Sequence, residues 1–165
     1  MKEYSDIVIR EIKPDEVSLL TEFLYEAIFQ PDNAPKVPRT IIQEPMIWAY
    51  VDRFGTKPGD FCFVALINGM IVGAAWSRLG CSYGKVNDAT PELAISLYLE
   101  YRNKGIGSRL LASLLNILKE NGYDKVSLSV DKTNYAVRMY LKHGFKIVVE
   151  REHDYLMIKR SHNLR

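Results

Sequence analysis

Hydrophobic and polar positions recur with two different periods along the chain, and the changes of period mark the boundaries of the predicted elements. Short apolar runs and alternating patterns predict strands at residues 7–12, 61–67, 70–76, 93–99, 125–130, 145–149 and 153–158. Apolar residues at helical spacing predict helices at residues 14–28, 108–120 and 134–143. A further helical region that ends at Gly55 should be broken into two short pieces at Pro45, because helical backbone is disfavoured at the residue before a proline.

The order of these elements predicts a mixed α/β fold. Asn68-Gly69 separates two apolar runs and is a strong hairpin signal, so the second and third strands should be antiparallel neighbours. Strand–helix–strand units follow, and the last two strands should form another hairpin. No linker, repeat or low-complexity stretch interrupts the pattern, so residues 1–165 are expected to form one domain.

The most informative polar stretch reads Arg-Asn-Lys-Gly-Ile-Gly at residues 102–107, between an apolar strand and the helix at 108–120. Glycine lets the backbone pass close to a ligand, and the free amides of a helix's first turn point outward at the positive end of its dipole. This arrangement is typical of a seat for a phosphate or pyrophosphate. The spacing excludes a Walker A loop, and Leu110 stands where the dinucleotide fingerprint requires a third glycine.

The pattern Arg-x-x-Gly-x-Gly resembles the pyrophosphate loop of the GNAT-family N-acetyltransferases, although Leu99 replaces the proline that precedes this loop in the family. A second stretch is similar to the family's Asn, Ala, Tyr, Gly-Phe signature, with Asn134, Ala136, Tyr140, Gly144 and Phe145 as the matching residues. Both signatures occur in the right order, so the resemblance covers nearly the whole chain. It implies the GNAT acyl-CoA N-acyltransferase fold, a mixed central sheet of about six or seven strands with about four helices, splayed at strands 4 and 5.

The resemblance implies acetyl-CoA as the cosubstrate, lying between the splayed strands. Pantetheine, a chain of amides, should pair with the backbones of Ile95 and Leu97 like an additional strand. The pyrophosphate should be held by the amides of Arg102, Asn103, Lys104, Gly105, Ile106, Gly107 and Ser108. Asn134 can cap the following helix alone, or, as the resemblance implies, cap it and also reach the pantetheine arm. Arg102 can also be a surface charge, although a cation there would oppose the helix dipole.

The resemblance also implies a direct attack by an amine on acetyl-CoA within a ternary complex. Tyr140 should protonate the departing thiolate, and the alternative for this residue is core packing. Glu92 should accept the ammonium proton directly or through water, with a strand-end surface glutamate as the alternative and Asp88 as a weaker candidate base. A backbone amide near Leu97 should polarise the acetyl carbonyl.

The sequence leaves the acceptor open among three hypotheses. The leading hypothesis is the primary amine of a small molecule, because residues 25–50 combine aromatic and proline residues that would suit a shaped pocket. The second is acetylation of a protein N-terminus or lysine. The third is a non-catalytic acyl-CoA sensor, against which Tyr140 argues, since a sensor needs no acid at the sulfur.

Composition narrows the class of protein further. The net charge of +2 is dispersed, which gives no indication of a nucleic-acid partner. No apolar run is long enough to span a membrane, the first residues lack the apolar region of a signal peptide, and a cytoplasmic protein is therefore expected. No metal site is expected, because His143, His153 and His162 lie in unlike positions. The apolar C-terminal strands could pair in a homodimer.

Overall fold

The computed structural model describes residues 6–160, so His162 and both ends of the expected 1–165 domain lie outside the described part. The elements in chain order are β1 (Ile7–Glu11), η1 (Pro14–Leu19), α1 (Leu20–Ala27), η2 (Arg39–Gln43), α2 (Pro45–Trp48), β2 (Phe61–Ile67), β3 (Met70–Arg78), β4 (Glu92–Leu97), η3 (Leu99–Tyr101), α3 (Ile106–Glu120), β5 (Lys125–Asp131), α4 (Ala136–Lys142), β6 (Lys146–Glu150) and β7 (Asp154–Arg160). The η elements are 3₁₀ helices.

The seven strands form one sheet in the order β1-β2-β3-β4-β5-β7-β6, which confirms the predicted mixed sheet. All neighbouring strands are antiparallel except β4 and β5, which run parallel. The register of β4 and β5 contains a single pair, Glu92 with Ser127, at the start of β4. Beyond that pair the two strands separate toward their carboxyl ends, as the predicted splay requires.

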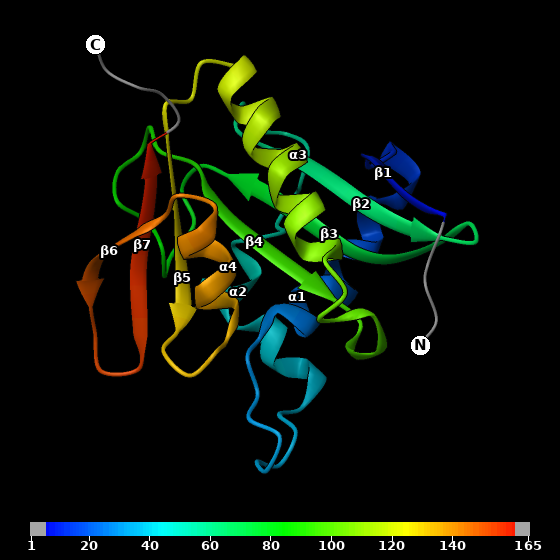
Figure 1. The fold of residues 1–165 in the computed structure, drawn as a ribbon, viewed down its shortest axis with the longest axis horizontal. Helices are drawn as coiled ribbons and strands as arrows, with labels where there is room; N and C mark the ends of the chain where they lie inside the picture. Colours follow the sequence, from blue (N-terminus) through cyan, green and yellow to red (C-terminus); the bar gives the residue numbers. More distant parts are fainter. Residues whose placement is uncertain (1–5, 161–165) are drawn as a thin grey trace.

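Helices cover both faces of the sheet (Figure 1): α3 and α4 lie on one face, and α1 and α2 on the other. The predicted apolar stripe of α3 is buried against the first face, through Ile106, Leu110, Leu111, Leu114 and Leu118. A second apolar cluster, which includes Leu20, Phe23, Leu24 and Trp76, joins α1 to β2 and β3 on the other face. The splayed pair β4 and β5 is therefore flanked by helices on both sides.

Most element boundaries agree with the predictions, and the differences have local causes. The predicted first helix begins as the 3₁₀ turn η1, where the Glu16 carboxylate accepts the backbone N–H of Lys13 and also binds Arg10. Asn68 and Gly69 both have positive φ, +50° and +78°, as a tight β2–β3 hairpin requires. β4 ends at Leu97, two residues earlier than predicted, because the chain turns into η3.

The last two strands form the predicted hairpin, but β7 lies next to β5 and β6 becomes the edge of the sheet. Exposed Ile147, Val148 and Val149 lie on this edge strand. A β-bulge interrupts its register between Ile147 and Val149, and edge strands often carry such bulges, which hinder pairing with another chain. Pairing in a homodimer stays a prediction.

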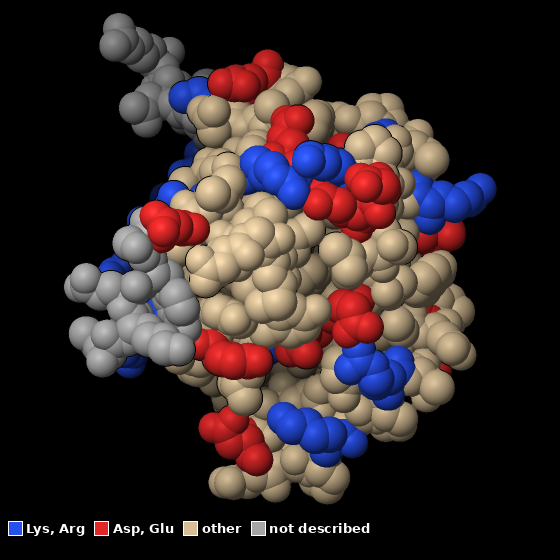
Figure 2. Space-filling model, turned by 90° about the vertical axis from the view of Figure 1, so that its right-hand side faces the viewer, with Lys and Arg blue, Asp and Glu red and all other residues tan. Residues whose placement is uncertain are grey.

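Charged residues of both signs are interspersed on the face drawn in Figure 2, around an uncharged central area. This face carries no continuous stripe of Lys and Arg such as nucleic-acid-binding proteins use. Within residues 6–160, no helix is both long enough and apolar enough to cross a bilayer.

Candidate active site

The alternation of β4 sorts the predicted site residues of this strand onto the two faces of the sheet. Leu93 and Leu97 belong to the cluster under α3, with Ile95 packed against it. Ser96 instead donates its hydroxyl to the Phe23 carbonyl of α1 at 2.6 Å. Even-numbered side chains of β4 therefore point toward α1 and α2, and odd-numbered ones toward α3 and α4.

The turn before α3 has the backbone shape that an anion site needs. Asn103 and Gly105 both adopt left-handed backbone, with φ of +62° and +81°. Successive amides around left-handed residues form concave anion sites, and here they adjoin the amino end of a 15-residue helix. Lys104 is exposed within the same turn. Five amides of this turn and the first helical turn have no hydrogen-bond acceptor among the described residues: those of Asn103, Gly105, Ile106, Gly107 and Ser108.

Arg102 requires a correction to the predicted phosphate seat. Its backbone N–H donates to the Leu99 carbonyl at 3.2 Å, so this amide is not free. Its side chain donates through Nε to the Leu97 carbonyl at 2.9 Å and through Nη2 to Glu26 Oε2 at 3.0 Å. Arg102 therefore ties the end of β4 to α1, and its backbone amide is already used within the protein.

Two asparagines lie in the loops that border the split. The Asn134 side-chain oxygen accepts the amide of Ala136, the first residue of α4, at 2.9 Å, whereas the N-cap position of this helix is Tyr135. Asn103 donates to the Tyr135 hydroxyl at 3.0 Å, so the loop before α3 contacts the loop before α4. Whether Asn134 also reaches a pantetheine arm stays a prediction.

Tyr140 lies on α4, on the α3 side of the sheet. It is 7% exposed and packs against Phe145 with ring centroids 5.6 Å apart in an edge-to-face arrangement. Burial raises the pKa of its phenol above the ordinary value. Its hydroxyl makes no hydrogen bond to another described residue, so it remains available to a ligand.

Glu92 lies on the opposite face and is buried, with only 3% of its surface exposed. The alternative of a surface glutamate was therefore wrong. Burial raises the pKa of this carboxyl to about 7, although hydrogen bonds from Tyr50 and the Gly84 backbone and the charge of Arg151 act in the other direction. Asp88 is 94% exposed and paired with Lys85, which leaves Glu92 as the better base.

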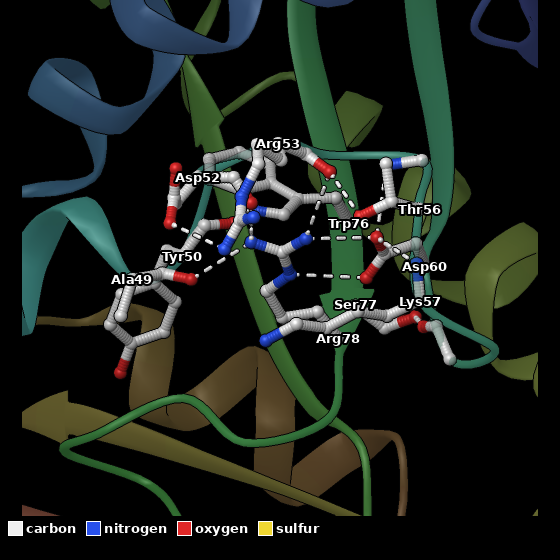
Figure 3. Close-up of polar contacts among 12 residues, drawn as sticks. Ala49, Tyr50, Asp52, Arg53, Thr56, Lys57, Asp60, Trp76, Ser77 and Arg78 are labelled. Atoms are coloured by element: carbon white, nitrogen blue, oxygen red, sulfur yellow. Dashed lines mark hydrogen bonds and ion pairs between the residues drawn. The ribbon is translucent and has the colours of Figure 1, made fainter.

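Sequence reasoning missed the polar cluster that lies next to Glu92. Buried Arg78 binds the buried carboxylate of Asp60 through Nε at 3.1 Å and Nη2 at 2.9 Å, and also donates to the carbonyls of Ala49 and Asp52 (Figure 3). Trp76 donates its indole N–H to the Tyr50 carbonyl at 3.0 Å. A charged residue at the end of an otherwise apolar strand was the available signal for Arg78, whereas no motif marked Tyr50.

The site has no group of side chains suited to a metal within residues 6–160. The two cysteines, Cys62 and Cys81, are buried, and burial raises the pKa of both thiols, which keeps them protonated and poorly nucleophilic near neutral pH. The site therefore offers a cradle of amides, a phenol and a carboxyl group on the two sides of a split sheet.

A split parallel pair with an amide-lined turn at one end defines the class of acyl-CoA-dependent N-acyltransferases. The model of the acetyltransferase (GNAT) family matches residues 22–145, more than half of the chain, and the chain belongs to this family. Among characterised proteins, it is similar to N-alpha-acetyltransferase 50 of Danio rerio, with 29% identity over 116 residues that cover 67% of this chain and 68% of the relative.

Solved structures agree on the fold. The structure of yncA from Salmonella typhimurium with its cofactor acetyl-CoA has a TM-score of 0.69 at 18% identity and covers 98% of this chain and 97% of its own. The PaiA N-acetyltransferase of Thermoplasma acidophilum, in complex with coenzyme A, has a TM-score of 0.66 at 21% identity and covers 94% of this chain and 99% of its own. The predicted GNAT fold is confirmed.

Proposed function

We propose that the protein transfers the acetyl group of acetyl-CoA to the primary amine of a small molecule by direct attack in a ternary complex. The observation that carries this proposal is that the amides of residues 103 and 105–108, which have no acceptor among the described residues, lie at the open end of the β4–β5 split. Main-chain amides at a helix terminus suit a pyrophosphate, and a gap between strands suits an amide-bearing chain such as pantetheine.

The two faces of the sheet would then have separate tasks. Pantetheine would pair with the backbones of Ile95 and Leu97, and the thioester sulfur would lie toward α4, where Tyr140 can donate its proton. The amine would approach from the α1 and α2 side, where Glu92 lies. The ammonium loses one proton to Glu92, and the neutral amine attacks the acetyl carbonyl and forms the new C–N bond. The C–S bond breaks as the thiolate takes the Tyr140 proton, and the second proton lost by the nitrogen passes through solvent to restore Tyr140.

Proton transfer to Glu92 would run through water. Glu92 and Ile95 are three positions apart on β4, which is roughly 10 Å along a strand. A direct transfer needs the carboxylate within hydrogen-bond distance of the amine, so an ordered water is required between them. A carboxyl with a pKa of about 7 suits this task, because it is partly ionised at neutral pH and can return its proton to solvent.

The acceptor would bind among the segments that cover the Glu92 side of the sheet. A hollow of about 400 Å³ lies between α1 and the η2–α2 segment, lined by Thr21, Ile42, Gln43 and Trp48. The hollow is widely open to solvent, so it would contact only one side of an acceptor. An aromatic and an aliphatic side chain with two polar ones can bind an amine that carries an apolar body.

A second candidate acceptor is the α-amino group of a peptide. It is favoured by the similarity to N-alpha-acetyltransferase 50 of Danio rerio and to the probable N-acetyltransferase san of Drosophila melanogaster. Both relatives match about two thirds of this chain. The chemistry at the β4–β5 split would be the same, and only the acceptor surface would differ.

A free-thiol assay with acetyl-CoA distinguishes the two acceptors. Release of CoA thiol with small primary amines and polyamines, but not with peptides, supports the leading proposal. Release with peptides alone supports the second candidate. Binding of acetyl-CoA in calorimetry without acceptor-dependent thiol release would contradict both and would leave a non-catalytic sensor.

The pyrophosphate seat can be tested separately with a matched pair of glycine variants. Gly105 and Gly122 both have positive φ, +81° and +85°, and a side chain would meet open space at either position. Gly105→Asp places a negative charge at the proposed seat and should abolish acetyl-CoA binding in calorimetry. Gly122→Asp imposes similar backbone strain at the far end of α3 and should bind normally. Equal affinity of both variants would show that the seat lies elsewhere.

A further inference from the structure

One oxygen of the Glu92 carboxylate lacks a partner. Oε1 is the one buried side-chain nitrogen or oxygen in residues 6–160 without a hydrogen bond, while Oε2 accepts the Tyr50 hydroxyl. Buried polar atoms are nearly always hydrogen-bonded, so an exception needs a physical explanation. An unpaired buried acceptor at the closed end of the sheet split is suited to a hydrogen bond from a water molecule.

The carboxylate is held on two sides. Gly84 packs so closely that a Cβ there would lie 2.7 Å from Glu92 Oε2 and 2.8 Å from its Cδ. Gly84 is in turn attached to β5, because the Ser127 hydroxyl donates to its carbonyl at 2.6 Å. Between Gly84 and the Tyr50 phenol, Oε2 is confined, and Oε1 is the oxygen left for a further hydrogen bond.

The backbone around Tyr50 is held in place by hydrogen bonds from buried side chains. Trp76 binds its carbonyl, and Arg78 binds the carbonyls of Ala49 and Asp52 on either side of it along the chain. Figure 3 shows the Tyr50 ring pointing away from this cluster, with its hydroxyl at the far end. The backbone of Tyr50 is therefore fixed from behind while its phenol reaches the carboxylate.

We propose that Tyr50 is the positioning residue for the catalytic carboxylate: its hydroxyl holds Oε2 and leaves Oε1 for the water that relays the acceptor's proton. This inference rests on the proposed function, in which Glu92 is the base. A phenol that donates to a carboxylate also stabilises the ionised form, so Tyr50 sets the pH at which the base becomes active.

Other titratable groups near Glu92 do not replace this role. Arg78 is its direct cross-strand neighbour but is committed to Asp60. Arg151 lowers the pKa of Glu92 through its charge and is itself paired with Asp154 at 3.1 Å. The Cys81 thiol lies within electrostatic range, and burial raises its pKa, so it stays neutral near pH 7. Tyr50 alone donates a side-chain hydrogen bond to Glu92 among the described residues.

The test is a carbon-13 NMR titration of protein labelled at the glutamate carboxyl carbons, with the Glu92 signal assigned by its loss in Glu92→Gln. In Tyr50→Phe the titration midpoint of Glu92 should move to higher pH by about one pH unit, because the ionised carboxylate loses one hydrogen bond. Tyr83→Phe is the matched control, because Tyr83 lies on the neighbouring loop and its ring is exposed. In this variant the titration midpoint of Glu92 should be unchanged. An unchanged midpoint in Tyr50→Phe would overturn the proposal.

The kinetic readout separates this inference from the proposed function. With an amine accepted in the free-thiol assay, Tyr50→Phe should lower kcat/KM about tenfold at neutral pH and move the acidic limb of the pH profile upward, with an unchanged KM for acetyl-CoA. A lower melting temperature with an unmoved limb would indicate a merely structural role and contradict the inference. If Glu92→Gln keeps full activity and the same limb, the assignment of the base fails instead.

A second variant covers the case in which Tyr50→Phe does not fold. Trp76→Phe removes the indole N–H that binds the Tyr50 carbonyl and keeps an aromatic ring in the core. It should shift the Glu92 midpoint in the same direction by a smaller amount, because Tyr50 keeps its hydroxyl but loses one backbone contact. A Trp76→Phe protein with an unchanged Glu92 midpoint would also contradict the proposal.

Discussion

Asp60 and Glu92 are two buried carboxylates on the same side of the sheet, with opposite fates. Arg78 stands directly across the β3–β4 ladder from Glu92, yet it gives its guanidinium to Asp60. Asp60 also accepts the backbone amides of Gly55 and Lys57, at 2.9 and 3.1 Å. Within residues 6–160, Glu92 has no cation in direct contact and keeps one oxygen unpaired.

The difference follows from how each carboxylate meets its donors. Asp60 meets the fork of Arg78 with both oxygens, and the remaining donors of that guanidinium bind main-chain carbonyls, so the charges and polar groups of this cluster are satisfied. Such a cluster fixes a loop and has no capacity for a ligand. A carboxylate that is buried but incompletely hydrogen-bonded is destabilised in its charged form, which raises its pKa. Raised pKa values of this kind are typical of catalytic groups.

The largest expected effect comes from the same carboxyl-to-amide change at both positions. Asp60→Asn leaves the buried Arg78 without a counter-charge and should lower the free energy of unfolding by about 3–5 kcal/mol. Glu92→Gln removes a charge that has no counter-ion in contact and should not destabilise the protein at pH 7. Urea denaturation of both variants measures the contrast, and equal losses would show that the two carboxylates are alike.

The pH dependence of stability sharpens the contrast. The Glu92 carboxyl has an ordinary pKa of 4.5, which the fold raises to about 7. Between these values the folded protein binds the additional proton, so this residue lowers the free energy of unfolding as pH rises, by on the order of 3 kcal/mol at 1.36 kcal/mol per pKa unit. The effect is complete above the folded pKa and absent below the unfolded one.

Comparison with Glu92→Gln isolates this contribution. The two proteins should be similarly stable below about pH 4.5, and the wild type should become progressively less stable than the variant as the pH rises from 4.5 to about 7. Urea denaturation at several pH values measures the difference. A constant gap across this window would mean that burial does not raise the pKa of Glu92.

The smallest expected effect concerns Gly84, which confines Glu92. A Cβ at Gly84 would lie 2.7 Å from Glu92 Oε2 and 2.8 Å from the backbone carbon of Leu128, so Gly84→Ala must displace the carboxylate. We expect a cost of about 1–3 kcal/mol in stability, as for other overpacked sites, together with a shifted acidic limb of activity. Gly59→Ala is the control, because its Cβ would clash with Leu79 at 2.8 Å and not with Glu92. If the acidic limb of activity shifted in both variants, the shift would be a general result of overpacking and not of displacing Glu92.

Local pattern was sufficient for most of the fold. Alternation and helical spacing located the seven strands and the helices α3 and α4. Each of these elements buries one face, and the apolar residues of that face recur at a regular spacing within a short stretch of sequence. Asn68-Gly69 identified its hairpin, since few residues adopt positive φ readily. The glycine turn before α3 was equally local, and its left-handed Gly105 lies where the motif predicted it.

The tertiary structure alone decided which polar groups meet. Tyr50 and Glu92 are 42 residues apart, and nothing near either residue indicates the other. Whether Arg102 would bind phosphate or tie α1 to β4 depended on Glu26, which lies 76 residues away along the chain. The sequence by itself determined the elements and the cradle of amides, since those follow from backbone preferences over a few residues. Long-range packing determined the burial of Glu92, its unpaired oxygen and its raised pKa, because desolvation depends on every segment that closes over a group.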